Sequence, residues 1–307
     1  MRTTGVTRFD EVIAPLRLPA VAAPMTFIST PELVAEACAA GIIGSFPTSN
    51  TASVAELDEW FDQIEAARAS SERTPGPIAA NLIVGKQNKR LDGDVECVVR
   101  HQPALVITSV GSPAAVIPAL REAGVLVLAD VASEAHAHKA LAAGADGLVL
   151  LSAGAGGHTG WANPFAFVRA VRAFFDGLLV VAGGMSDGAS LWAAQCAGFD
   201  LALFGTRFIA THESAAPLNW REALVAGSMD DISVDVAPNG VKASVLADGS
   251  GSPVGSAGHT VSAVHDQLSV AELVDEIEAG WLQARANTSE LLGDELLDAN
   301  SEAAVPS

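Results

Sequence analysis

A run of small residues at 152–160, Ser-Ala-Gly-Ala-Gly-Gly-His-Thr-Gly, encloses a single histidine. It directly follows the apolar stretch 147–151, which has the length and composition of a buried strand. Glycines let a backbone approach a ligand closely, and an imidazole can gain or lose a proton near neutral pH. A plain flexible loop would also be rich in glycine. The position of this lone imidazole at a strand end favours a catalytic role for His158.

Two glycine turns follow the next two apolar stretches of the chain. The first turn contains Gly183-Gly184, and the second contains Gly205-Thr206. Backbone N–H groups in such turns can bind phosphate without help from lysine or arginine. Either turn alone could be a tight connection or a packing feature. Because the two turns occur at successive strand ends, together they predict a phosphate site.

Three further residues have types that suit a planar heterocycle. Pro24 and Met25 follow the first apolar stretch, and Asn81 lies inside the third. A methionine offers a polarizable surface to a ring, and a buried asparagine needs hydrogen-bond partners that a ring edge can supply. Two alternatives stay open: Met25 can fill a gap in the core, and Asn81 can link neighbouring strands.

The elements that must position these residues repeat regularly along the chain. Short apolar stretches alternate with alanine-rich helical stretches, as in a parallel sheet covered on both faces. The apolar stretches are residues 20–23, 42–45, 78–83, 105–108, 125–130, 147–151, 179–182 and 201–204. Eight such units favour an α/β fold of the (β/α)8, or TIM barrel, type over its rival, an open doubly wound sheet. In a barrel, chemistry is expected at the carboxyl ends of the strands.

The regular alternation stops after residue 204, which suggests how the chain is divided. We expect residues 1–212 to form the barrel, completed by a helix at 269–283 that begins with the capping pair Ser269 and Glu272. For residues 213–268 we expect an excursion of short helices and glycine- and serine-rich loop, packed as a cap at the barrel mouth. For residues 284–307, which are rich in acidic side chains, we expect a peripheral tail.

The composition excludes several classes of partner. The chain has 307 residues, with 36 acidic and 17 basic side chains and a net charge of -19. Binding to nucleic acid or to an anionic membrane needs clustered lysine and arginine, so neither is expected. The three cysteines lie far apart, and His136 and His138 would point to different faces of a helix, so no metal site is expected. We expect a cytoplasmic protein that acts on a small molecule, with a homodimer left open.

These motifs together resemble a known family, the nitronate monooxygenases, formerly called 2-nitropropane dioxygenases. The resemblance rests mainly on the motifs at residues 153–158, 182–184 and 204–211, with lesser support from 106–109 and 256–259. It covers most of the chain, from residue 22 to about residue 278. It implies an FMN-dependent (β/α)8 barrel that oxidises alkyl nitronates, or nitroalkanes, to a carbonyl compound and nitrite, with O2 as the electron acceptor.

The resemblance also implies a role for individual residues. His158 is the implied active-site base. The implied phosphate contacts of FMN are Gly183, Gly184, Gly205 and Thr206. The implied contacts to the flavin ring are Pro24, Met25, Asn81, Asp130, Gly156 and Gly157. Ser152 and His259 are the implied substrate contacts.

The chain departs from the family pattern in two respects. Many members carry a lysine at the end of the fifth strand, where this chain has Asp130, and an acid there would not stabilise negative charge on reduced flavin. One subgroup uses tyrosine in its substrate pocket, and this chain has no tyrosine.

Three alternatives to nitronate oxidation therefore remain open. The first is an NAD(P)H-dependent flavin reductase on the same scaffold, of the enoyl-acyl-carrier-protein or quinone reductase type. The second is a non-catalytic protein that binds a flavin or phosphate ligand. The third is a phosphosugar enzyme of the barrel class without flavin.

Overall fold

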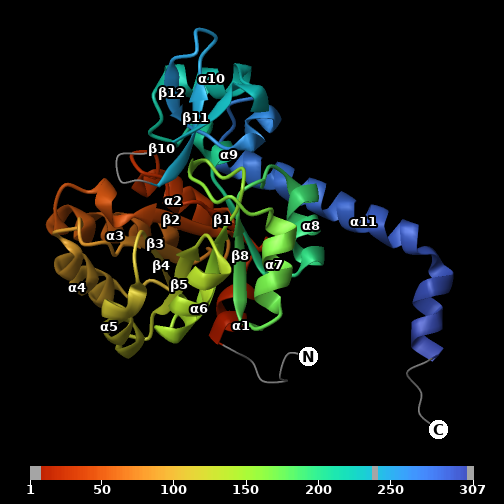
Figure 1. Ribbon diagram of the computed structural model, residues 1–307, viewed down its shortest axis with the longest axis horizontal. Coiled ribbons are helices and arrows are strands. Elements are labelled where there is room, and N and C mark those ends of the chain that lie inside the picture. The colour runs from red at the N-terminus through yellow and green to blue at the C-terminus, as the bar shows by residue number, and fades with distance from the viewer. Residues whose placement is uncertain (1–7, 237–240, 303–307) are drawn as a thin grey trace.

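A closed barrel of parallel strands forms the centre of the protein. The computed structural model describes residues 8–236 and 241–302. Within these residues, eight strands close into a barrel in which β9 pairs with β1 (Figure 1). These strands are β1 (Ala20–Ala22), β2 (Ile43–Pro47), β3 (Ile78–Ile83), β4 (Leu105–Ser109), β5 (Leu126–Val131), β6 (Gly147–Leu151), β8 (Leu178–Ala182) and β9 (Leu201–Phe204). The predicted TIM barrel is confirmed, and the open sheet is excluded.

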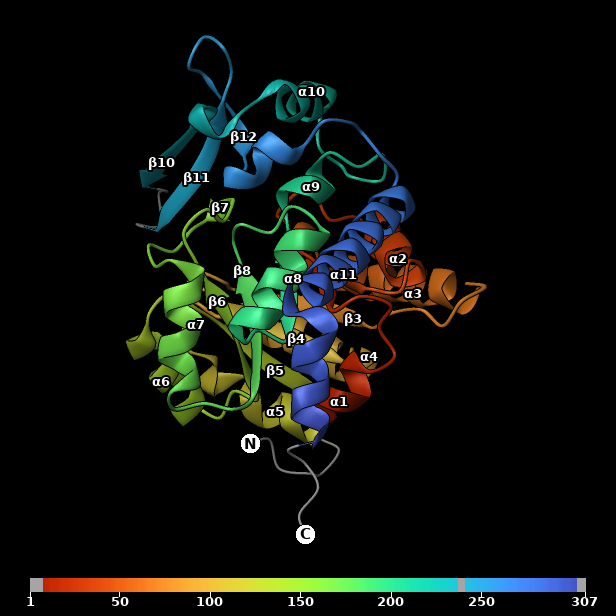
Figure 2. The ribbon, with the colours of Figure 1, turned by 90° about the vertical axis from the view of Figure 1, so that its right-hand side faces the viewer.

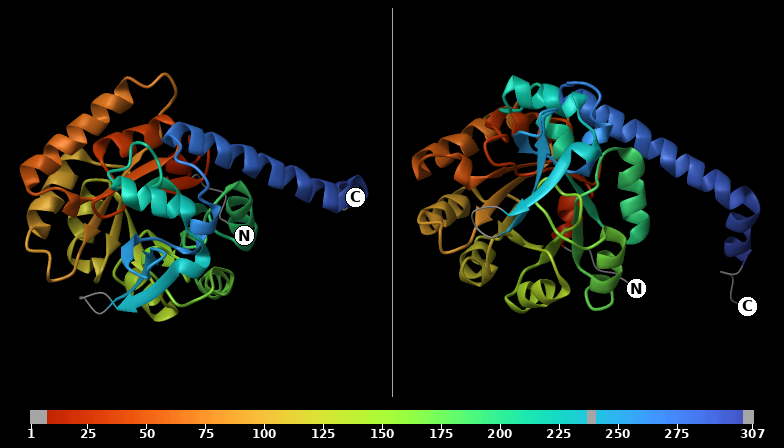
Figure 3. Two further views of the ribbon diagram at one scale, coloured as in Figure 1. Left: turned by 90° about the horizontal axis from the view of Figure 1, so that it is seen from above. Right: turned by 45° about the horizontal axis from the view of Figure 1, so that its top comes forward.

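Helices connect the strands and surround the barrel (Figure 3). They are α2 (Pro31–Ala39), α3 (Val54–Ala69), α4 (Leu91–His101), α5 (Ile117–Glu122), α6 (Glu134–Ala142), α7 (Pro164–Arg172) and α8 (Gly188–Ala197), with the short 3-10 turns η1 (Thr48–Asn50) and η2 (Pro113–Ala115). Several begin at the side chains that the sequence suggests, because Thr30, Ser53 and Asn163 each accept a backbone N–H of the first turn. The strands are buried on both faces, which explains their unbroken apolar sequences.

The amino-terminal end of the barrel is closed by α1 (Arg8–Ile13). Phe9, Val12 and Ile13 pack against the apolar side chains that fill the barrel interior. Figure 1 shows α1 on the side of the barrel away from the later β10, β11 and β12. The interior is therefore a packed core, and a ligand can approach only from the opposite, carboxyl end of the strands.

The chain after β9 forms a second unit over this open end. It contains α9 (Thr206–Ile209), α10 (Leu218–Ala226), η3 (Met229–Asp231), β10 (Ile232–Val236), β11 (Lys242–Ala247), β12 (Pro253–Ser256) and η4 (His259–Ala263). β10, β11 and β12 pair as an antiparallel sheet above the barrel (Figures 1 and 2). We call residues 213–268 the excursion. The sequence predicts helices and loop here, whereas the structure adds a sheet. These strands were not predicted because β10 is almost wholly exposed and β11 is buried only at alternate residues, so neither has a continuous apolar run.

A long final helix, α11 (Val270–Glu302), returns from the excursion to the barrel. It begins at the predicted capping pair, in which the N–H of Ser269 donates to the Glu272 carboxylate at 2.8 Å. It packs on α8 so closely that a Cβ on Gly188 would overlap the backbone of Trp281. The helix does not end near residue 283 but continues through most of the expected tail, and residues 303–307 lie outside the described part (Figure 1). Within the described residues, no helix combines the length and apolar character needed to cross a membrane.

Candidate active site

A cavity of about 420 Å³ lies at the carboxyl ends of the barrel strands, beneath the excursion. We call it the main cavity. Its walls come from the segment after β1, from β3, β4, β5, β6, β8 and β9 and, on the excursion side, from Trp220, Ala243, Ser256 and Thr260. A volume of several hundred Å³ is typical of sites for cofactors and small ligands. Among the described residues that line the main cavity there is no lysine or arginine, and Asp130 and His158 are its only acidic and imidazole side chains.

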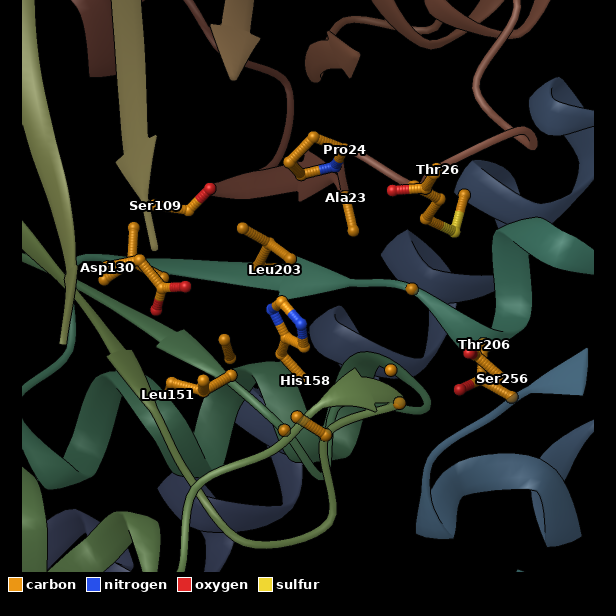
Figure 4. Close-up of a pocket in the computed structure, with 18 of the residues that line it drawn as sticks. Ala23, Pro24, Thr26, Ser109, Asp130, Leu151, His158, Leu203, Thr206 and Ser256 are labelled. Atoms are coloured by element: carbon orange, nitrogen blue, oxygen red, sulfur yellow. The ribbon is translucent and has the colours of Figure 1, made fainter. Parts of the chain in front are cut away.

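His158 enters the main cavity from a short strand rather than from a loose loop. This strand, β7 (Gly157–His158), pairs antiparallel with β11, and His158 lies opposite Ala243. The next residue extends the pairing, because the N–H of Thr159 donates to the carbonyl of Lys242 at 3.0 Å. The imidazole faces the cavity (Figure 4) and is partly buried. Burial lowers the pKa of His158, so the ring is neutral around pH 7.

The glycine loop before His158 interlocks with the excursion. A Cβ on Gly156 would lie 2.8 Å from the backbone nitrogen of Gly258, which real side chains do not tolerate. The N–H of His259 donates to the carbonyl of Gly154 at 3.1 Å. The excursion therefore fixes the path of the loop that carries the imidazole, and glycine at 156 permits this close approach.

The two glycine turns lie side by side in the wall of the main cavity. Gly183 and Gly184 have φ values of 117° and 78°, in the left-handed region that favours glycine. A Cβ on Gly184 would meet no atom within 4 Å, so open space adjoins this backbone. In the neighbouring turn, the Thr206 hydroxyl accepts the backbone N–H of Gly258 at 2.9 Å. The turns thus form a backbone cradle that the excursion borders.

The segment that follows β1 lies beside the turn after β9, because β1 pairs with β9, and one residue of β3 lies across the barrel from β8. The backbone of Met25 is fixed by two hydrogen bonds: its N–H donates to the Ser29 hydroxyl, and its carbonyl accepts from Asn50 Nδ2, both at 3.0 Å. Asn81 Nδ2 donates to the carbonyl of Ile107 at 2.9 Å and to the Ser109 hydroxyl at 3.1 Å. Asn81 therefore does link neighbouring strands, and these bonds use its nitrogen and leave its oxygen for another partner.

Asp130 occupies the end of β5, and its carboxyl faces the same space as the His158 imidazole (Figure 4). One carboxyl oxygen, Oδ1, is buried and has no hydrogen-bond partner. Burial raises the pKa of Asp130 to about 7. A buried polar atom without a partner is rare in folded proteins and often marks a functional site.

The family model described as nitronate monooxygenase matches residues 88–290, which carry β4 to β9, His158, both glycine turns and the excursion. The chain belongs to the nitronate monooxygenase family. The expectation drawn from the sequence motifs is therefore confirmed at the level of the family.

The proteins to which this chain is similar are named as different enzymes. It is 27% identical over 240 residues to (3aS,4S,5R,7aS)-5-hydroxy-7a-methyl-1-oxo-octahydro-1H-indene-4-carboxyl-CoA dehydrogenase of Rhodococcus jostii (strain RHA1), covering 78% of this chain and 65% of that relative. It is 28% identical over 254 residues to nitronate monooxygenase of Paraburkholderia phytofirmans (strain DSM 17436 / LMG 22146 / PsJN), covering 67% of each. The chain thus spans about two thirds of the length of these relatives. The solved structure of FabK from Thermotoga maritima superposes with a TM-score of 0.80 at 23% identity, covering 93% of this chain and 99% of that one, and shows a shared fold.

The main cavity of this nitronate monooxygenase family member fits the FMN that the family resemblance implies. The open space at Gly184 adjoins a backbone cradle that suits a phosphate group. The walls around Asn81 and Met25 are largely apolar, which suits a planar ring, and the unpartnered Oδ1 of Asp130 suits a polar ring edge. The absence of lysine and arginine among the described lining residues agrees with phosphate binding by backbone groups.

The structure brings most of the predicted site residues of this family member into one place. The predicted residues that line the main cavity are Pro24, Met25, Asn81, Asp130, Gly156, Gly157, His158, Gly183, Gly184, Gly205 and Thr206. Ser152 and His259 do not line it. The buried Ser152 hydroxyl donates to the carbonyl of Leu150 at 3.1 Å, and the His259 ring packs against Gly154. The functional roles of all thirteen residues stay predictions.

A second cavity of about 300 Å³ adjoins the main one and was not foreseen from the sequence. It lies between the turn after β4 and helix α6, and it shares Val110, Asp130, Leu151 and His158 with the main cavity. His136 and Lys139 of α6 also line it. The most unusual backbone conformation in its lining is that of Val110, whose φ of 56° is an outlier for a β-branched residue. Sequence patterns do not record such an outlier, because it depends on the tertiary surroundings of the turn.

Outside both cavities, Asp58, Cys97 and His101 lie close enough together to share an ion. Other contacts account for their arrangement. Arg100 Nη2 and His101 Nε2 both contact Asp58 Oδ1, at 2.7 and 2.8 Å, and the His101 ring stacks on Phe61 with centroids 4.7 Å apart. We interpret the cluster as an ion-pair contact between α3 and α4.

Proposed function

We propose that this protein is an FMN-dependent oxidoreductase that oxidises alkyl nitronates with O2 to a carbonyl compound and nitrite. One observation carries the proposal: in a chain of the nitronate monooxygenase family, His158 and the backbone cradle after β8 and β9 face one largely apolar cavity. FMN bound there would supply the redox chemistry, taking electrons from the substrate and passing them to O2. The protein would contribute orientation, a proton acceptor and a largely apolar setting.

The residues around the main cavity divide into two groups under this proposal. The turns at 183–184 and 205–206 would hold the phosphate through their backbone. Pro24 and Met25 beside the turn after β9, and Asn81 on β3, would contact the ring, with Gly156 and Gly157 passing close to it. The two groups leave the side near His158 for the substrate.

His158 is the residue that would handle protons. A neutral imidazole has one N–H donor and one lone pair. The donor would hold an oxygen of a bound nitronate, and the lone pair would take a proton from the carbon of a neutral nitroalkane. The lowered pKa of His158 keeps the imidazole unprotonated at neutral pH.

Anaerobic mixing tests the proposal directly. Protein loaded with FMN should be yellow, absorbing near ~450 nm as oxidised flavins do. The nitronate of 1-nitropropane should bleach this colour, and admitted O2 should restore it with release of nitrite. Failure to bind FMN would contradict the proposal, as would rapid bleaching by NADPH without bleaching by the nitronate.

A second candidate is an NAD(P)H-dependent flavin reductase that acts on a larger substrate. The second cavity favours it, because this adjoining space exceeds what a small nitronate needs. A relative named for a CoA dehydrogenase and the structural similarity to FabK add support. In the same experiment, this candidate predicts bleaching by NADPH and return of the colour on anaerobic addition of an enoyl thioester or a quinone.

A further inference from the structure

Asp130 is a partly buried acid that the proposed reaction leaves without a role. Its Oδ1 atom has no hydrogen-bond partner, although asparagine, serine and histidine side chains line the same cavity. Burial alone accounts for the raised pKa of Asp130, so no neighbouring charge compensates the ionised form. An ionised carboxylate would therefore face the main cavity with its charge unbalanced.

The groups that face Asp130 come from four neighbouring elements. β4 contributes the Ser109 hydroxyl, which accepts from Asn81. β6 contributes only the apolar Val149 and Leu151. The titratable groups are His158 of β7 in both cavities, and His136 and Lys139 of α6 in the second cavity. Both α6 side chains are solvent-exposed, so they lie toward the outer rim rather than against the carboxyl.

We propose that Asp130 is neutral in the cofactor site and that its carboxyl O–H donates a hydrogen bond to an acceptor atom of the flavin ring. This inference rests on the proposed binding of FMN. A protonated carboxyl has one O–H donor, whereas an ionised carboxylate can only accept.

His158 and Asp130 then form a complementary pair across one cavity. Burial leaves His158 neutral, with a lone pair that accepts a proton. Burial also favours the protonated form of Asp130, which has a proton to donate. Titratable groups whose surroundings displace their pKa values in opposite senses mark separate base and acid roles. The cavity thus provides both roles while carrying almost no net charge.

The pH dependence of FMN affinity tests the donor role. The dissociation constant is measured by flavin fluorescence from pH 5.5 to 9 for wild type, Asp130→Asn and the control Asp176→Asn. Asp176 is exposed in the turn before β8, at the opposite end of the barrel. The side-chain amide of the Asp130→Asn variant keeps an N–H donor that does not ionise, so below pH 6 we expect equal affinities for all three proteins. Above pH 7, wild type and the control should weaken relative to Asp130→Asn by up to about tenfold per pH unit.

A constant ratio of wild-type to Asp130→Asn affinity over the whole pH range would overturn the inference while leaving the proposed function intact. No FMN binding by wild type and by Asp176→Asn would overturn both. Because the titration of FMN itself is common to all three proteins, it cancels in the ratios.

A second measurement, on the apoprotein, needs neither flavin nor folding of the asparagine variant. Infrared titration of the wild-type apoprotein should show a protonated carboxyl that persists to about pH 7, well above the ordinary aspartate range. Asp130→Ser, which keeps a hydroxyl donor, should lack this band. Absence of the band in wild type at pH 6 would contradict the neutral carboxyl.

Discussion

At the scale of single residues, function depends on which side chains face the main cavity and in which protonation state. His158 is held by strand pairing to β11 and is neutral because it is partly buried. Its proposed role as a base applies to neutral nitroalkanes, whereas nitronates have already lost the proton. Comparing the turnover rates of the two kinds of substrate therefore distinguishes base catalysis by His158 from simple binding.

We expect His158→Asn to retain FMN and to slow turnover of neutral 1-nitropropane by about 10²–10⁴, the usual contribution of a general base. Turnover of the preformed nitronate should fall much less. The wild-type rate with nitroalkane should rise with pH, with a midpoint below the ordinary histidine value of 6.5, because the neutral ring is the reactive form. Steady-state kinetics check this, with His265→Asn on the exposed part of the excursion as the control. An unchanged nitroalkane rate would remove His158 from its assigned role.

Asp130 should also make stability depend on pH. Below the ordinary value of 3.8 the carboxyl is neutral in both folded and unfolded chains, so it carries no penalty. Between 3.8 and about 7 the unfolded chain loses the proton while the folded chain keeps it, so the penalty grows and then levels off. We expect Asp130→Asn to leave the free energy of unfolding unchanged at pH 4 and to raise it at pH 8 by up to about 4 kcal/mol. Equal effects at the two pH values in denaturant titrations would contradict this.

At the scale of elements, the carboxyl ends of neighbouring barrel strands bring the two glycine turns together. The two glycines of the turn after β8 serve different purposes. Gly183 has a left-handed backbone, and a Cβ there would lie 3.0 Å from the nitrogen of Ala155, so it is required for packing. Gly184 shares the backbone conformation but adjoins open space, where we place the phosphate.

We predict that Gly184→Ala weakens FMN binding by about tenfold or more, equivalent to about 1.4 kcal/mol, while lowering stability only by the modest strain of a left-handed alanine. The matched control is Gly251→Ala. Gly251 has a similar φ of 81° and equally open surroundings, but it lies at the exposed tip between β11 and β12. FMN titration and thermal unfolding of both variants check the prediction. Equal FMN affinity of the two variants would place the phosphate elsewhere.

The sequence predicted the barrel elements well and the excursion poorly, for one physical reason. Strands such as β3 and β8 are buried on both faces, so nearly all of their residues are apolar and form a continuous run in the sequence. β10 is almost wholly exposed, and β7 has only two residues, so neither carries a comparable pattern. The pairing of β7 with β11 joins segments about eighty residues apart along the chain, and no local signal predicts it.

At the scale of the whole molecule, the acidic excess lies away from the main cavity. Several arginines are engaged in ion pairs within the fold, among them Arg90 with Asp94 and Arg172 with Asp200, both at 2.7 Å. The main cavity has one carboxyl among its described lining residues. Most of the 36 acidic side chains therefore contribute to an outer shell of negative charge, which repels itself in the compact state.

We expect added salt to stabilise the protein, because ions screen this repulsion over a Debye length that falls from about 10 Å at 0.1 M to about 3 Å at 1 M. The thermal midpoint should rise by several degrees between these concentrations of sodium chloride. Potassium chloride should match sodium chloride if general screening is responsible. A midpoint that is independent of salt would show that the surface charge does not limit stability.

The sequence by itself determined the barrel, the strand ends that carry the site and the glycine cradle, because burial and backbone conformation select residue types locally. It also placed eleven of the proposed site residues in what proved to be one cavity. Only the tertiary structure decided that His158 lies on a strand held by the excursion, that Ser152 and His259 lie outside the lining of the main cavity, and that a second cavity opens beside Asp130. It also decided the protonation of Asp130, because desolvation depends on every atom packed around a carboxyl, and those atoms come from distant parts of the chain.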